Sequence, residues 1–180
     1  MMKSRSDNVN TRNLVVDILL AVTRDGEFSH IAIRDVLDKY RYLPKQDRAF
    51  ITRLSQGTIE RMIELDAIIN QFSKTKVKKM KPVIAAILRS GVYQLKYMDS
   101  VPDSAACNEA VKLTVKRGFS GLKGFVNGVM RSIARNMDQV KLPDAKKEPV
   151  KYLSVRYSVP EWIVQRFTEQ YGTESCEKSL

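Results

Sequence analysis

The sequence predicts an all-α fold, a bundle of about seven helices followed by a linker and a short further segment. Two observations predict it. The stretch 101–133 reads as two helices joined by a glycine-containing turn, and apolar residues of the second recur at i, i+3, i+4, i+7, i+8 and i+11. No stretch before about residue 137 alternates at the period of two that a half-buried strand requires. We therefore expect helices to supply the core.

The first helices follow a basic N-terminal segment. Residues 1–9 are polar and have no apolar period, so we expect a flexible basic arm. Asn10 or Thr11 can cap a first helix, and Asp25-Gly26 ends it. Ser29 can cap a shorter second helix. Each of these helices has one apolar face, which requires a partner surface.

A long helical period follows. Pro44 suits the first turn of a helix, and the apolar spacing continues to Phe72. We expect a break near Gly57 or Glu64, because one helix of this length is unusual in a small domain.

A lysine-rich loop separates this stretch from the next helix. Residues 74–82 contain five lysines, and Pro82 opens a helix that includes Gly91. A glycine inside a helix costs about 1 kcal/mol relative to alanine. We therefore expect a close helix contact at Gly91 to compensate.

The helical hairpin at 101–133 has recognisable ends. Its first helix starts after Pro102, with Asp103 or Ser104 as the cap. Lys116-Arg117-Gly118 ends it, because cations favour the last turn of a helix and glycine tolerates positive φ.

The composition changes after residue 137. Residues 138–150 are polar, contain two prolines and have no period, which is typical of a linker. Residues 150–160 are rich in tyrosine and valine and end at a proline, so we expect extended backbone. Residues 161–171 are amphipathic again. Thr173 begins a further element that stops at Leu180, so we expect the sequence to end within an element.

The charge balance favours a polyanion as the partner. The 180 residues contain 31 Lys and Arg against 20 Asp and Glu, a net charge of +11, which suits nucleic acid better than a small neutral ligand. We expect no membrane span and a cytoplasmic protein. Cys107 and Cys176 have no metal-like spacing, and His30 is the sole histidine, so neither a metal site nor a disulfide framework is expected.

Several motifs together resemble the NusB family, and the resemblance covers about residues 8–137. The motifs are Val101-Pro102, Asn108-Glu109-Ala110, Phe125-Val126-Asn127-Gly128-Val129, and the segments 14–19 and 47–61. The continuation YLSVRYSVPEWIVQRFTEQYG resembles the lead-in of the RsmB (Sun/Fmu) family of ribosomal RNA cytosine-C5 methyltransferases.

The resemblance implies a division of the chain and a function. Residues 10–137 would be a NusB-like RNA-binding domain, 138–150 a linker, and 151–180 the start of the methyltransferase lead-in subdomain. The domain would position small-subunit rRNA for a catalytic domain that uses S-adenosylmethionine. The alternatives are a transcription antitermination factor, a module that binds a ribosomal protein, and a domain that braces its own catalytic domain.

Catalysis by these residues alone is not expected. The family's chemistry requires cysteines in Pro-Cys and Thr-Cys motifs and a glycine-rich turn between a strand and a helix for the cofactor. Cys107 follows alanine, Cys176 follows serine, and the hairpin glycines follow no predicted strand. S-adenosylmethionine is therefore implied for the whole enzyme only, and no cofactor is expected here.

Ten residues are candidates for RNA contact, from the resemblance and from their charge or aromatic character. They are Arg5, Arg12, Lys76, Lys78, Lys79, Lys116, Arg117, Lys123, Phe125 and Asn127. Lys74 and Lys81 belong to the same loop as three of them.

Several candidates have an alternative structural role. Phe125 lies in an apolar stripe and could pack in the core. Asn127-Gly128 could serve a close helix crossing, and the lysines of 74–81 a solvated loop. Lys116 and Arg117 could serve only the helix dipole.

Overall fold

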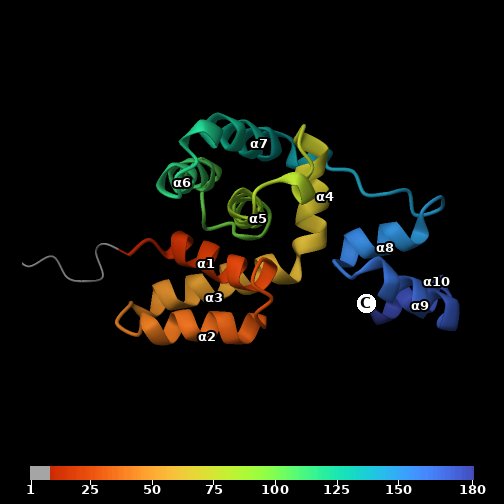
Figure 1. Cartoon of the computed structure of the whole chain (residues 1–180). Helices are drawn as coiled ribbons and strands as arrows, with labels where there is room; N and C mark the ends of the chain where they lie inside the picture. Colours follow the sequence, from red (N-terminus) through yellow and green to blue (C-terminus); the bar gives the residue numbers. More distant parts are fainter. Residues whose placement is uncertain (1–8) are drawn as a thin grey trace, which may run out of the picture.

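A computed structural model describes residues 9–180, which form ten α-helices and no strand (Figure 1). The all-α class and the bundle of seven helices are confirmed. The bundle consists of α1 (Thr11–Thr23), α2 (Ser29–Lys39), α3 (Lys45–Glu60), α4 (Met62–Phe72), α5 (Pro82–Tyr97), α6 (Asp103–Lys116) and α7 (Lys123–Asn136). Three more helices follow: α8 (Pro149–Tyr157), α9 (Glu161–Tyr171) and α10 (Thr173–Ser179). Arg5 lies outside the described residues.

Helix α5 is the centre of the bundle. It packs against α1 and α3 on one side, α6 and α7 on the other, and α4 along its flank (Figure 1). Its buried residues lie on almost every side of the helix and are Ile84, Ala85, Ala86, Ile87, Leu88, Ser90, Gly91, Val92 and Gln94. No helix among residues 9–180 combines the length and the hydrophobicity that crossing a bilayer demands.

Gly91 of α5 allows α7 to approach closely, as predicted. A Cβ atom at this position would lie 2.6 Å from Cε and 2.8 Å from Sδ of Met130. Met130 is itself fully buried, at 0% exposure, so its side chain has little room to give way. The glycine therefore leaves the space that the end of the Met130 side chain occupies between these two helices.

Two predicted helix ends are confirmed. The Asn10 side chain accepts a hydrogen bond of 3.0 Å from the Asn13 backbone N–H and caps α1. Gly118 follows the last turn of α6 with φ of +86°, a conformation that glycine adopts without a steric penalty.

Two other predicted caps are wrong. The N-cap of α2 is Phe28, and Ser29 is already helical. The N-cap of α6 is Pro102, and no side chain caps either helix. Pro102 supplies the extended entry at φ of −60°, which leaves Asp103 in the first turn, where a negative charge suits the helix dipole.

The long helical stretch is interrupted as predicted, and the break lies at Arg61, between α3 and α4. Just beyond it, the Glu64 carboxylate is buried, with its side chain 5% exposed. One of its oxygens accepts hydrogen bonds from Lys96 Nζ at 2.7 Å and from the Tyr97 hydroxyl at 2.5 Å. These contacts tie α4 to the end of α5.

The predicted extended backbone at 150–160 is wrong, because α8 is helical. Pro149 stands in its first turn, where its fixed φ suits a helix. Leu153 is buried with Val164 and Cys176 in a second, smaller core. Burial in this core outweighs the β-propensity of tyrosine and valine.

The helices α8 to α10 are joined to the bundle through α4. The Ser158 hydroxyl accepts hydrogen bonds from the backbone N–H groups of Ile63 at 3.1 Å and Glu64 at 3.4 Å. Gln71 and Lys141 exchange two hydrogen bonds, of 2.9 and 3.0 Å, between α4 and the predicted linker. The segment after residue 137 is thus held along α4.

Replacing Gly91 by leucine should destabilise the fold by about 1–3 kcal/mol, because the added atoms overpack the contact with Met130. Gly128→Ala is the matched control in α7, since no heavy atom lies within 4 Å of a Cβ built there. This change should stabilise the protein by up to about 1 kcal/mol through helix propensity. Urea unfolding measures both, and equal effects of the two variants would contradict the assigned contact.

Candidate nucleic-acid interface

Phe125 lies beside the lysine-rich loop. A hollow of about 280 Å³ is lined by Thr75, Lys79, Met80, Lys81, Ile84, Leu122 and Phe125. The loop residues come from between α4 and α5, and Phe125 comes from the first turn of α7. The close packing of α7 on α5 therefore brings an aromatic ring and two cations to one place.

The lysine-rich loop has an ordered backbone. Val77 is buried, and its N–H donates to Asn70 Oδ1 at 2.9 Å. Lys76 Nζ donates to the Asn70 carbonyl at 3.2 Å, so this lysine is already engaged. All five loop lysines are exposed to solvent: Lys74, Lys76, Lys78, Lys79 and Lys81. The loop therefore presents a fixed set of positive charges.

Phe125 lies partly in the core and partly at the surface. It is half-buried and packs against the main core. Its remaining surface lines the hollow with Lys79 and Lys81. Phe119 lies close by, with Lys81 Nζ 5.7 Å from its ring centroid.

Arg12 holds helices together in the structure. Its Nε donates to Gln94 Oε1 at 2.7 Å, and its guanidinium lies 5.0 Å from the Phe50 ring centroid. Burial lowers the pKa of Arg12, and the negative charge of Glu109 opposes this shift. These contacts join α1, α3 and α5.

Arg117 holds the other side of α1. Its Nε donates to Asn13 Oδ1 at 2.8 Å, and its Nη2 donates to Asp17 Oδ1 at 2.6 Å. Its side chain is only 19% exposed, whereas the neighbouring Lys116 is exposed. Of this predicted pair, only Lys116 is open to a ligand.

A second hollow, of about 510 Å³, lies between α6 and α7. It is lined by Asn108, Val111, Lys112, Lys123, Gly124 and Asn127. Arg131 joins the two asparagines: its Nε donates to Asn127 Oδ1 and its Nη2 to Asn108 Oδ1, each at 2.9 Å. Sequence reasoning missed the roles of Asn108 and Arg131, although Asn108 begins the Asn-Glu-Ala motif.

The glycines of α7 face outwards. A Cβ atom at Gly124 or at Gly128 would meet no heavy atom within 4 Å. The alternative of a close helix crossing at Asn127-Gly128 is therefore excluded. Because these positions have no side chain, the solvent-facing side of α7 between the Phe125 hollow and the Asn108–Asn127 hollow is accessible.

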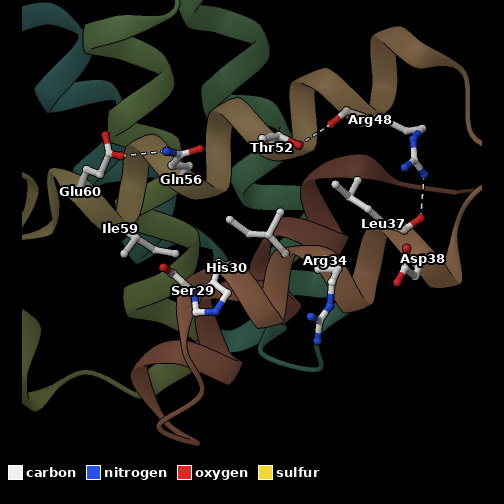
Figure 2. A pocket seen from close by; sticks show the side chains of 11 residues that line it. Ser29, His30, Arg34, Leu37, Asp38, Arg48, Thr52, Gln56, Ile59 and Glu60 are labelled. Atoms are coloured by element: carbon white, nitrogen blue, oxygen red, sulfur yellow. Dashed lines mark hydrogen bonds between the residues drawn. The ribbon is translucent and has the colours of Figure 1, made fainter.

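Sequence reasoning also missed a groove between α2 and α3, of about 430 Å³ (Figure 2). Ile33, Leu37 and Ile59 contribute apolar surface. His30 lies on its edge and is exposed. Arg48 is engaged within the fold, because its Nη1 donates a hydrogen bond to the Leu37 carbonyl at 2.7 Å (Figure 2). No lysine lines this groove.

The two cysteines lie in different cores, Cys107 in the main core and Cys176 in the second. Cys107 is buried, and burial raises the pKa of its thiol, which opposes formation of a nucleophilic thiolate. Within residues 9–180 no group of three or more His, Cys, Asp or Glu side chains could hold a metal ion. The glycines at 118–128 follow the helix α6.

The family model of the NusB family matches residues 9–135. The chain is 36% identical over 169 residues to the probable ribosomal RNA small subunit methyltransferase B of Bacillus subtilis, covering 94% of this chain and 37% of that protein. A protein of the same description from Synechocystis is 34% identical over 170 residues, with the same coverage of both chains. The transcription antitermination protein NusB of Ruminiclostridium cellulolyticum is 27% identical, covering 74% of this chain and 90% of that protein.

Solved structures share the fold. A chain from the complex of the antitermination factors NusB and NusE with double-stranded RNA has a TM-score of 0.64 at 22% identity, covering 75% of this chain and 98% of that chain. The structure of PH0851 has a TM-score of 0.68 at 16% identity, covering 94% of this chain and 38% of that chain. This chain thus spans little more than a third of the methyltransferases that it matches, at 37% of their length. By the match over residues 9–135 and the shared fold, the chain belongs to the NusB family.

Proposed function

We propose that this chain is the RNA-binding domain of an S-adenosylmethionine-dependent rRNA cytosine-C5 methyltransferase and that it positions small-subunit rRNA for a catalytic domain. The observation that carries the proposal is the hollow in which Phe125 lies beside Lys79 and Lys81. The similarity to small-subunit rRNA methyltransferases over 94% of this chain supports the choice of substrate.

The hollow suits a nucleotide of a single-stranded or looped RNA. A base stacks on the exposed part of Phe125, and the lysine ammonium groups neutralise the adjacent phosphates. Residues 74–81 contain five lysines and no acidic residue, so no local carboxylate weakens this attraction. Lys123 extends the positive surface on the other side of α7.

The chemistry belongs to the remainder of such an enzyme. S-adenosylmethionine supplies the methyl group, and the catalytic domain of the same protein binds it and is a further partner of this chain. The residues of this chain contribute binding and orientation only. The proposal places the protein in the cytoplasm, where its rRNA substrate is found.

RNA affinity should fall steeply with salt, with a slope of about −0.7 in log K against log salt for each phosphate neutralised. Lys79→Glu combined with Lys81→Glu should weaken binding of small-subunit rRNA fragments about 10-fold or more and should reduce this slope. Fluorescence anisotropy titrations at several salt concentrations measure both quantities.

The matched control is Lys45→Glu with Lys178→Glu, which changes the net charge equally at exposed sites on α3 and α10. If wild-type binding is independent of salt, or if both double variants behave alike, the proposed surface is wrong.

Phe125→Leu should keep most of the core packing and remove the stacking surface. We expect a stability loss below about 1.5 kcal/mol, because the volume is largely conserved. RNA binding should weaken by about 1–3 kcal/mol, the value of one base–aromatic stack. Thermal unfolding and anisotropy measure the two effects on the same samples. Phe167→Leu on α9 is the control, and an equal binding loss there would argue against stacking on Phe125.

The groove between α2 and α3 favours a second candidate function, in which the domain binds a ribosomal protein. Phe28 borders the groove and is 69% exposed, an unusual position for so large an apolar side chain. Exposed aromatic and aliphatic side chains beside a concave surface are typical of protein-binding sites.

Ile33→Glu should weaken such a complex about 10-fold or more, because it places a charge on the apolar part of the groove. Calorimetry with nuclease-treated, purified small-subunit ribosomal proteins, tested one at a time, measures this effect. Val115→Glu on the exposed face of α6 is the control. Absence of binding by every protein tested would remove this candidate.

A further inference from the structure

We propose that Asn108, Asn127 and Arg131 form a phosphate-binding cluster, which contacts the RNA backbone between α6 and α7. This inference rests on the proposed RNA-binding function and deepens it. Asn108 comes from α6, and the other two residues come from α7. All three are accessible, since Asn108 and Arg131 are exposed and Asn127 is half-exposed.

The hydrogen bonds of Arg131 determine how the two carboxamides point. A guanidinium only donates, so each asparagine must turn its oxygen towards Arg131. The structure has this arrangement, with both oxygens 2.9 Å from guanidinium nitrogens. The two NH₂ groups are therefore the free ends of the carboxamides, and Asn108 and Asn127 both line the hollow.

The cluster is positively charged and offers more hydrogen-bond donors than acceptors. Both carboxamide oxygens are occupied by Arg131, and the NH₂ groups remain available. Lys112 and Lys123 line the same hollow. A ligand that matches this set accepts several hydrogen bonds, donates none and is negatively charged. An RNA phosphodiester has all three properties.

The charge of the two helices supports a phosphate ligand. Helices α6 and α7 together contain five Lys and Arg residues and two acidic residues. One of the acids, Glu109, is paired with Lys112 at 3.3 Å, and the other, Asp103, is in the first turn of α6. The residues of α7 that line the hollow are Lys123, Gly124 and Asn127, none of which is acidic. Arg131 lies behind them, bonded to Asn127, and lines a neighbouring hollow with Asp103 and Arg135.

The cluster and the Phe125 hollow lie on opposite sides of the first turns of α7. Leu122 and Phe125 face one hollow, whereas Lys123 and Asn127 face the other. Gly124 leaves the ridge between them free of a side chain. One strand of RNA can therefore cross α7, with a base at Phe125 and a phosphate at the cluster.

Isosteric changes test the cluster. Asn108→Asp and Asn127→Asp preserve the oxygen that accepts from Arg131 and replace each donor NH₂ by a negatively charged oxygen. Asn108→Ala with Asn127→Ala removes the donors without adding charge. Gln46→Glu, at an exposed position in the first turn of α3, adds the same charge away from the cluster. Thermal unfolding of each variant checks that the fold is intact.

Fluorescence anisotropy measures binding to four single-stranded RNAs, one of mixed sequence and three homopolymers of U, A or C. Each RNA has about 12 nucleotides, a length that suits one binding module. Each aspartate variant should weaken binding of all four RNAs about 10-fold or more, as expected for a lost hydrogen bond to a charged group. The double alanine variant should also bind more weakly, and Gln46→Glu should bind as the wild type does.

The other outcomes separate this inference from the proposed function. If the wild-type chain binds none of the RNAs, the proposed function fails and the cluster with it. If the Lys79 and Lys81 variant loses binding but the aspartate variants match Gln46→Glu, only the cluster is wrong. If the double alanine variant binds RNA as tightly as the wild type does, the aspartate variants bind weakly only because their negative charge repels the phosphate. That result would overturn the donor role of the two asparagines. A loss confined to one base would overturn the phosphate assignment.

Discussion

The close approach of α7 to α5 at Gly91 is the constraint on which the surface depends. Met130 fills the space that a side chain on Gly91 would occupy, and it is completely buried. Because α5 begins at Pro82, directly after the lysine-rich loop, the position of α7 on α5 decides which residues meet that loop. In this packing Phe125 lines one hollow with Lys79 and Lys81. The interior of the bundle thus determines a feature of its exterior.

The segment after residue 137 continues the bundle with a different electrostatic character. Residues 148–180 contain four Lys and Arg residues and five glutamates, so the excess of positive charge lies before them. Ser158 joins this segment to the start of α4, beside the buried Glu64 carboxylate. Burial and the hydrogen bond to Glu64 raise the pKa of Tyr97, so the hydroxyl remains a donor there. The excess of positive charge and the attached helices thus belong to different parts of the sequence.

Periodicity predicts the interior of this protein better than its surface. The stripes of α1 and α7, the break near Glu64 and the contact at Gly91 all follow from spacing and helix propensity. The helix at 149–157 was not predictable from local propensity, because its stability comes from packing in the second core. The joint role of Asn108 and Arg131 also escaped prediction, because the two residues are 23 positions apart and meet only when α6 packs on α7.

Several arginines of this chain make contacts within the bundle, whereas the loop lysines are exposed. The positive charge of the sequence alone therefore could not identify the proposed RNA-binding surface. Arg12, Arg89 and Arg117 use their planar guanidinium groups for contacts within the bundle, and Arg89 pairs with Asp66 through two hydrogen bonds of 2.6 and 2.8 Å. The loop lysines, whose flexible side chains suit long-range attraction, remain exposed. Lysine attraction to RNA carries little geometric information. Under the proposed function, any preference for a particular RNA shape must therefore come from the few groups whose position the fold determines, Phe125 and the cluster around Arg131.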